Sequence, residues 1–251
     1  MADAAAPSPT QTAASRVIFI AGATGYTGRA LVAEGRRRGI SVVAHIRPGS
    51  RRAAALVPQF KALGATVAEL PWEPAPLAEA LATHNVTHVF SLLGITAAGA
   101  RKEQARTGQT MPTYDAVDKG LTLMLHTACE VCTPAPLFVY LSSLGADSPG
   151  TSAYLKARYD VEAALREGPV PWLSVRPSFI SGPDRDESRP MERVGSVAAD
   201  ALLSVVGMLG GRTVRDRYAT VPAAELARRM LDIALSGAPG RTVDMADLRR
   251  S

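Results

Sequence analysis

Several features that often reveal a protein's class are scarce in this sequence. Only two of the 251 residues are cysteine, and Cys129 and Cys132 form one isolated CxxC at the end of an apolar, helix-like stretch. A redox pair would need a thioredoxin-like βαβ setting, so we favour two reduced, partly buried thiols. The four histidines are scattered without the spacing of metal ligands, and we expect no metal site. No apolar run approaches the roughly 18 uncharged residues of a membrane span, and we expect none.

The sequence also lacks the features of a signal peptide and a cluster of basic residues typical of a nucleic-acid-binding surface. The first 15 residues have neither a basic segment nor an apolar core, so we expect a disordered tail at 1–15 and a cytoplasmic protein. The net charge is +5, and the densest basic run, at 35–39, has the form of a helix end closed by Gly39. A nucleic-acid-binding protein would gather such charge on one face, so we expect no nucleic-acid partner.

Short apolar runs alternate with segments of helical spacing from residue 16 to about residue 177. Strands are predicted at 16–22, 40–47, 65–70, 86–94, 136–143 and 171–177. Helices are predicted at 27–39, 50–64, 76–85, 111–132 and 152–168, with Pro58 breaking or kinking the second. The alternation predicts a single α/β domain over 16–251, a Rossmann-type doubly wound parallel sheet with helices on both faces. The irregular helical pattern at about 190–251 predicts a small C-terminal lobe on the substrate side.

Two polar stretches, at 95–110 and 180–193, interrupt this alternation. They follow the fourth and sixth predicted strands, at the carboxyl ends where ligands bind in such sheets. We interpret them as loops bordering a binding site, while simple solvation of polar loops is the alternative.

The segment AGATGYTGRAL joins the first predicted strand to the first predicted helix. It places Gly22, Gly25 and Gly28 where bare backbone N–H groups can approach a pyrophosphate at a helix N-terminus. A glycine triplet alone is a weak signal, and an ordinary strand–helix turn is the alternative. Its position in the first βαβ unit favours a dinucleotide-binding loop.

The end of the second predicted strand, AHIRPGSRR, lacks the acidic residue that holds the ribose 2′-hydroxyl in NAD sites. Arg47 stands there instead, and Arg51 or Arg52 could assist it. Because arginine pairs well with phosphate, we expect NADP (NADPH) as the cofactor, with NAD as the alternative.

Five segments resemble the short-chain dehydrogenase/reductase superfamily, in its atypical branch with G-x-x-G-x-x-G spacing. They are GATGYTG, SLLG, LSSLGAD, YLKARYDVEA and RPSFISGPDRDESRP, within residues 16–195. The nearest resemblance is to the Tat-interactive-protein-like oxidoreductases, which neighbour the NmrA-like proteins, because DRxESRP is not general in the superfamily.

The resemblance implies an NADP site and catalysis by serine, tyrosine and lysine. The implied cofactor residues are Gly22, Thr24, Gly25, Tyr26, Thr27 and Gly28 at the diphosphate, Arg47 at the 2′-phosphate, Leu93 and Gly94 beside the adenosine ribose, and Pro177, Ser178, Phe179 and Ile180 at the nicotinamide. Tyr154 would donate a proton to a carbonyl oxygen that Ser143, the second serine of its pair, hydrogen-bonds. Capping of a strand end is the alternative role for Ser142 and Ser143.

The sequence departs from the family pattern at the position of the catalytic lysine. The pattern is Y-x-x-x-K, but the residue four after Tyr154 is Arg158, and Lys156 comes two after it. Residues i and i+4 share a helix face, whereas i+2 points nearly the opposite way. We therefore expect Arg158 to supply the charge and the ribose contact, and Lys156 to be solvated. Arginine releases a proton less readily than lysine, so a proton relay through Arg158 is not expected.

Two functions follow. The first is an NAD(P)H-dependent reductase acting on a ketone, quinone or enone of a small, largely apolar molecule. The Ala-, Arg- and Pro-rich composition resembles that of GC-rich bacteria, where such reductases often serve secondary metabolism. The second is a non-catalytic NADP-binding sensor or regulatory protein, as the NmrA-like neighbours are, and Arg158 is the feature in its favour. Either a monomer or a homodimer is compatible with the sequence.

Overall fold

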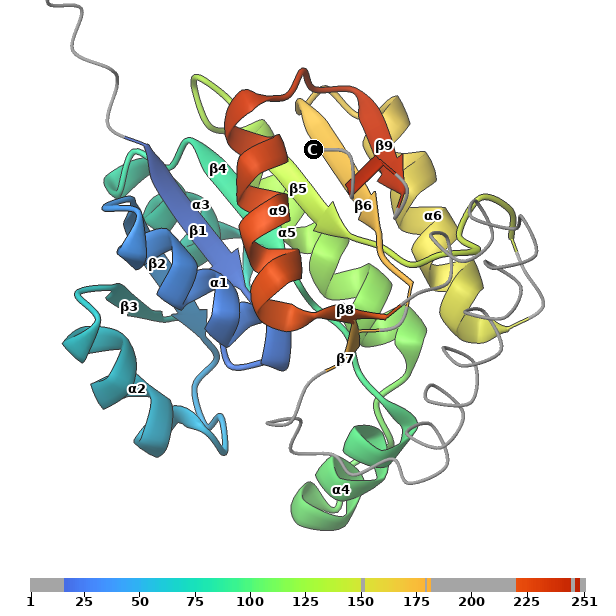
Figure 1. The fold of residues 1–251 in the computed structure, drawn as a ribbon. Coiled ribbons are helices and arrows are strands. Elements are labelled where there is room, and N and C mark those ends of the chain that lie inside the picture. Colours follow the sequence, from blue (N-terminus) through green and yellow to red (C-terminus); the bar gives the residue numbers. More distant parts are fainter. Residues whose placement is uncertain (1–15, 150–151, 179, 182–219, 245–246, 249–251) are drawn as a thin grey trace, which may run out of the picture.

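The computed structural model describes residues 16–149, 152–178, 180–181, 220–244 and 247–248. Seven parallel strands in this part of the chain form one sheet (Figure 1). They are β1 (Val17–Ala21), β2 (Ser41–Ile46), β3 (Thr66–Glu69), β4 (His88–Ser91), β5 (Leu137–Leu141), β6 (Trp172–Arg176) and β9 (Arg241–Asp244), in the order β3-β2-β1-β4-β5-β6-β9. Two short strands, β7 (Ile180–Ser181) and β8 (Val221–Pro222), pair with each other outside this sheet.

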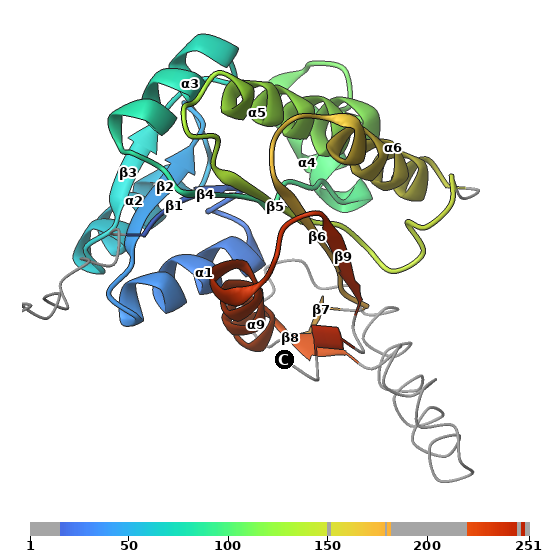
Figure 2. The same ribbon diagram turned by 90° about the horizontal axis from the view of Figure 1, so that it is seen from above.

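Helices cover both faces of the sheet (Figure 2). On one face lie α1 (Tyr26–Arg37) and α9 (Ala223–Ser236), and on the other α3 (Pro74–Thr83), α5 (Leu121–Glu130) and α6 (Ala153–Glu167). The described part of the chain also contains α2 (Ala53–Ala62), α4 (Ala97–Thr107) and the π-helix η1 (Asp115–Gly120), which leads into α5. This arrangement confirms the predicted Rossmann-type, doubly wound α/β fold.

The central strands are apolar on both faces because both faces are covered. In β1, Ile18 and Ile20 pack with the α1 and α9 layer, while Phe19 packs with the α3 and α5 layer. All three side chains are fully buried. Burial of a side chain of this size contributes roughly 1.5–3 kcal/mol, so the strand that carries the glycine loop is firmly held.

The carboxyl ends of β1 and β4 lie side by side, with Ala21 in register with Ser91. From these ends the chain leaves toward opposite faces, to α1 on one side and toward α5 on the other. Because the chain leaves these two neighbouring strands toward opposite faces, a crevice lies outside their carboxyl ends. Ligands bind in this crevice in open α/β sheets.

The stretch 95–110, which we expected to be a polar loop, contains the helix α4. Its residues are good helix formers, the Thr96 side chain accepts a hydrogen bond from the Gly99 N–H, and Gly108 ends it with a left-handed φ of +68°. The helix has no large apolar residues, so its sequence lacks the apolar stripe by which helices were predicted.

The structure adds information on two further elements, α2 and β9. The helix α2 continues through Pro58, so of the two predicted effects of this proline the break does not occur, and the helix buries Leu56 and Phe60 on either side of it. The strand β9 was not predicted, because Arg241–Asp244 is too short to show an alternating pattern.

Residues 1–15 and 190–219, expected to be a tail and the first part of a C-terminal lobe, lie outside the described residues. Farther along that expected lobe, α9 packs on α1 and β9 extends the main sheet beside β6.

Candidate active site

The glycine loop between β1 and α1 has a backbone that only glycine permits at two positions. Gly22 has a φ of +81°, and a Cβ there would lie 2.8 Å from the carbonyl oxygen of Leu92. A Cβ on Gly28 would lie 2.1 Å from the carbonyl oxygen of Gly22. The loop therefore holds α1 tightly against the end of β1.

The N-terminus of α1 opens toward the space in front of this loop. Its N-cap, Gly25, has no side chain to satisfy the first N–H groups of the helix, and the first turn contains no acidic residue. Unsatisfied N–H groups and the helix dipole together favour an anion at this position.

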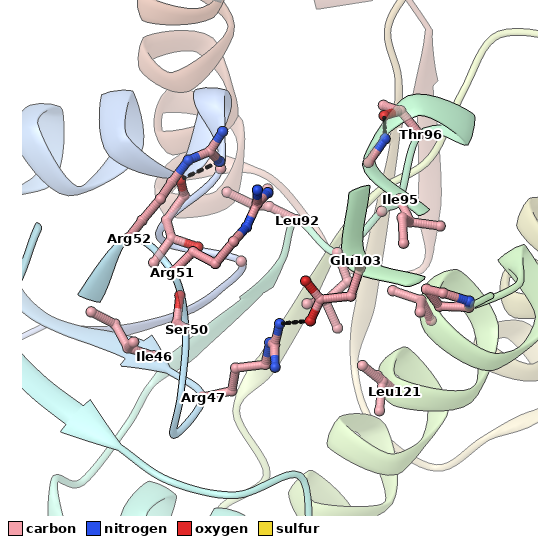
Figure 3. A pocket seen from close by; sticks show the side chains of 18 of the residues that line it. Ile46, Arg47, Ser50, Arg51, Arg52, Leu92, Ile95, Thr96, Glu103 and Leu121 are labelled. Carbon is pink, nitrogen blue, oxygen red and sulfur yellow. Dashed lines mark hydrogen bonds and ion pairs between the residues drawn. The ribbon is translucent and has the colours of Figure 1, made fainter. Parts of the chain in front are cut away.

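A cavity of about 580 Å³ lies between the glycine loop, the end of β2, the end of β4 and α4 (Figure 3). Among the predicted cofactor residues, those that line it are Gly22, Thr24, Gly25, Tyr26, Arg47, Leu93 and Gly94. Thr27 is buried behind the loop, and Gly28 packs against it.

The cavity is strongly basic. It is lined by four arginines: Arg29, Arg47, Arg51 and Arg52. Arg29 and Arg52 each donate a hydrogen bond to the Thr24 carbonyl, both at 3.2 Å. Arg51 and Arg52, expected to assist Arg47, thus lie in the same cavity, and Arg29 is an addition that sequence reasoning missed.

Arg47 reaches from the end of β2 across the cavity to α4. Its Nη2 lies 2.7 Å from Oε1 of Glu103 (Figure 3). Glu103 also pairs with Arg106 at 2.8 Å. Hydrogen bonds from Arg106 and Arg47 outweigh partial burial and lower the pKa of Glu103 to about 2, so this carboxylate is charged.

Tyr154 and Arg158 lie on one face of α6, as their spacing predicts. The guanidinium carbon of Arg158 is 5.1 Å from the centre of the Tyr154 ring. The ring of Tyr114 meets that of Tyr154 edge-on, with their centres 5.4 Å apart. Lys156 points away, its side chain is 63% exposed, and its Nζ pairs with Asp160 at 2.9 Å.

Arg158 is buried and its terminal N–H groups are fully engaged. Nη1 donates to the Tyr140 hydroxyl at 3.1 Å and to the Leu141 carbonyl at 2.6 Å. Nη2 donates to the Leu93 carbonyl at 3.2 Å and to Oδ1 of Asp118 at 2.7 Å. Only Nε, also buried, has no partner in the described residues. The guanidinium therefore ties the ends of β4 and β5 to α6.

Asp118 is a member of this site that sequence reasoning missed. It lies in η1 with its side chain fully buried, and its Oδ2 accepts a hydrogen bond from the Ile95 N–H at 3.0 Å. Burial raises the pKa of Asp118, and the Arg158 charge opposes that rise. Asp118 stands beside another charged residue, Lys119, and the sequence gave no signal that its carboxylate would be buried.

The two serines after β5 have different surroundings. Ser142 is buried and donates a hydrogen bond of 2.6 Å to Glu162, whose carboxylate also pairs with Arg176. Ser143 is half-buried, and its hydroxyl donates a long hydrogen bond of 3.3 Å to the Leu144 carbonyl. Ser142 is thus committed to a buried network, whereas Ser143 is more accessible.

The segment expected at the nicotinamide follows β6. The Pro177 carbonyl accepts a hydrogen bond from the Leu144 N–H at 2.9 Å, which places this segment beside the serine loop. Ile180 begins β7, and the carbonyl of the next residue, Ser181, accepts a hydrogen bond from the Tyr26 hydroxyl at 3.3 Å. Ser178 lies between them, and Phe179 lies outside the described residues.

Comparison with known proteins identifies the family. Residues 22–201 match the NAD(P)H-binding family over most of the chain. The chain belongs to this NAD(P)H-binding family. A nicotinamide dinucleotide is therefore its class of cofactor. A search among curated proteins found no match.

Solved structures with the same fold include enzymes of different activities. One is the 3-oxoacyl-[acyl-carrier protein] reductase from Brucella melitensis, 17% identical, with a TM-score of 0.62 over 92% of this chain and 90% of that one. Another is the UDP-glucose 4-epimerase of Thermus thermophilus in complex with NAD, 16% identical, with a TM-score of 0.56 over 93% of this chain and 80% of that one. The UDP-N-acetylglucosamine 4-epimerase from Bacillus cereus is 15% identical, with a TM-score of 0.59 over 91% and 78%. At these identities the likeness shows the fold alone.

The part of the chain that the structure describes has neither a membrane-spanning helix nor a cluster of metal ligands. None of its helices has the length and apolar character to cross a membrane. No group of three or more His, Cys, Asp or Glu side chains is placed there to hold a metal ion.

Proposed function

We propose that this protein is an NADPH-dependent reductase of the short-chain dehydrogenase/reductase kind. Its substrate would be a ketone, quinone or enone of a small, largely apolar molecule. The observation that carries the proposal is the placement of Tyr154 against the buried cation of Arg158, at the strand ends that also present Ser143.

The residues at the glycine loop fit a nicotinamide dinucleotide. Gly22 and Gly28 allow the tight backbone path of the loop, because a Cβ at either position would collide with neighbouring backbone, and the opening of α1 has unsatisfied N–H groups suited to a diphosphate. Arg47, with Arg51 nearby, would hold a 2′-phosphate, which supports NADPH over NADH. When bound, NADPH supplies the hydride.

In the proposed reaction, Tyr154 donates its phenolic proton to the substrate carbonyl oxygen. The Ser143 hydroxyl donates a hydrogen bond to the same oxygen and orients it. The positive charge of Arg158 beside the Tyr154 ring stabilises the phenolate that remains. The terminal N–H groups of Arg158 are all occupied, so a contact with the nicotinamide ribose would require it to exchange one partner.

A second cavity supports an apolar substrate. It has a volume of about 320 Å³ and lies between α4, the segment 111–115 and the start of α6. Its mostly apolar lining includes Met111, Tyr114, Ala153 and Ala157, and it shares Ile95, Thr96 and Pro112 with the larger cavity. Tyr114 connects it to the reactive region through its contact with Tyr154.

The test is Tyr154→Phe, measured by single-turnover oxidation of NADPH on a panel of lipophilic ketones, quinones and enones. Loss of the proton donor is expected to slow the chemical step by roughly 10²–10⁴-fold. NADPH affinity, followed in parallel by calorimetry, should stay within about twofold, because the ring is kept. Normal turnover by the variant would reject tyrosine-dependent carbonyl reduction.

A non-catalytic NADP-binding sensor is the second candidate. The observation in its favour is the engagement of Arg158 with protein groups and of Lys156 with Asp160, so that neither of these two cations of α6 is a proton carrier for Tyr154. A sensor would bind NADPH in calorimetry and oxidise it with no member of the carbonyl panel.

A further inference from the structure

The larger cavity contains one acidic side chain among its described lining residues. That side chain is Glu103 of α4, which faces four arginines across the cavity. A carboxylate in a pocket suited to a phosphorylated cofactor repels the phosphates of that cofactor, although the carboxylate itself is stabilised by an arginine partner. The partner of Glu103 across the cavity is Arg47, the residue to which we assign the 2′-phosphate.

Glu103 is held in place from its own helix. Arg106, one turn later, donates to Oε2 at 3.2 Å through Nε and to Oε1 at 2.8 Å through Nη2. The side chain of Glu103 is only 20% exposed, whereas that of Arg47 is 44% exposed. The carboxylate is therefore the fixed member of the cross-cavity pair, and Arg47 is the member that is freer to change partner.

Two other arginines of the cavity, Arg29 and Arg52, are directed to the glycine loop. Arg29 and Arg52 both donate to the Thr24 carbonyl, at a point next to the diphosphate position. Arg47 forms its ion pair with the carboxylate of Glu103, which has the same charge sign as a 2′-phosphate. A 2′-phosphate at Arg47 must displace Glu103 or lie beside its negative charge.

Resting on the proposed function, we propose that Glu103 is a specificity-determining residue that competes with the 2′-phosphate of NADPH for Arg47. NADH has no phosphate at this position, so its binding does not require the Arg47–Glu103 pair to open. Glu103 thereby reduces the preference for NADPH that the arginines alone would give. It also keeps Arg47 paired before the cofactor arrives.

The test is Glu103→Gln, which removes the charge and keeps the size and a hydrogen-bond acceptor for Arg106. Dissociation constants for NADPH and NADH are measured by calorimetry at low ionic strength. We expect NADPH affinity to rise by about three- to tenfold and NADH affinity to change by less than about twofold, because only the phosphate meets the lost charge. Glu79→Gln, an exposed change of equal charge on α3 and outside the cavity, is the control and should leave both affinities unchanged.

A second comparison shows whether the effect passes through Arg47. In an Arg47→Ala background, Glu103→Gln should lose most of its selective gain, since the competed cation is gone. Equal gains for NADPH and NADH would instead indicate a general loosening of α4 and would overturn the proposal. Weaker NADH binding with unchanged NADPH binding would also overturn it, because Glu103 would then accept a ribose hydroxyl.

Failure of the proposed function is distinguishable from failure of this inference. If the unaltered protein binds neither nucleotide, the proposed function fails and the role of Glu103 fails with it. If NADPH binds and Glu103→Gln leaves the ratio of the two affinities unchanged, only the role of Glu103 is rejected.

Discussion

Arg158 and Asp118 form a buried ion pair, with 2.7 Å between Nη2 and Oδ1 and with 7% and 0% of their side chains exposed. The pair joins α6 to η1 beside the ring of Tyr154, at the position where the Y-x-x-x-K pattern that this segment resembles has a lysine. An arginine here does what a lysine cannot, because its planar fork reaches acceptors at the end of β5, just beyond the end of β4 and on Asp118 at once.

The first prediction concerns stability. Arg158→Ala should lower the free energy of unfolding by about 3–5 kcal/mol, because Asp118 would stay buried without its partner. Arg158→Lys should lower it by about 1–3 kcal/mol, since one ammonium cannot replace both ends of the guanidinium. Lys156→Ala is the control and should cost less than about 1 kcal/mol, since that side chain is mostly exposed. Urea unfolding measures all three, and a silent Arg158→Lys would mean that the guanidinium fork is dispensable.

The second prediction separates the two serines. Ser142→Ala removes a buried hydrogen bond to the Glu162 carboxylate and should cost about 1.5–3 kcal/mol of stability. Ser143→Ala should leave stability within about 0.5 kcal/mol and, under the proposed reaction, slow turnover by about 10²–10³-fold. Thermal unfolding and single-turnover kinetics on both variants decide the assignment, and a reversal of the two effects would exchange the roles.

The third prediction separates cofactor binding from folding within the glycine loop. Gly25 has an ordinary φ of −74° and lines the cavity, so Gly25→Val should abolish NADPH binding while the protein stays folded. Gly28→Ala should instead lower the melting temperature, because its Cβ would collide with the loop backbone. Calorimetric binding and circular dichroism distinguish these outcomes. NADPH affinity retained by Gly25→Val would move the cofactor away from this loop.

The fourth prediction is a pH dependence of stability. Hydrogen bonds from Arg37 and Arg38, opposed by partial burial, lower the pKa of Glu34 from 4.5 to about 2. A carboxyl whose pKa is lower in the folded state stabilises the fold above its unfolded pKa and loses this contribution as the pH falls toward the folded value. The difference in unfolding free energy between the unaltered protein and Glu34→Gln should therefore be constant above about pH 5.5 and shrink toward pH 2. A difference independent of pH over this range would contradict the assignment.

Much of the fold was predictable because its signals are local. The strands β1 to β6 are short apolar runs, and the glycines of the first loop lie between a strand and a helix. The helix α4 was missed although Thr96 and Gly108, its capping residues, are visible in the sequence. The edge strand β9 was missed because its pairing with β6 is a tertiary effect.

The relative directions of side chains in the candidate site were predictable where one element carries the residues. Tyr154, Lys156 and Arg158 occupy a single helix, so their relative directions follow from helix geometry. Glu103 and Asp118 meet Arg47 and Arg158 across 56 and 40 residues of chain, and nothing in the local sequence indicates these partners. The burial that makes Asp118 important exists only after the sheet and η1 have assembled.

The packing of α9 on α1 also determines when the molecule can finish folding during its synthesis. Arg38 at the end of α1 pairs with Asp232 of α9 at 2.7 Å, and Leu31 of α1 is buried in the same core cluster as Met230 of α9. A growing chain makes β1 and α1 early and α9 late, so the apolar side of α1 stays open to water, or to a chaperone, until α9 leaves the ribosome. The half of the molecule that contains the glycine loop is thus synthesised first, but its packing is completed last, when α9 covers α1.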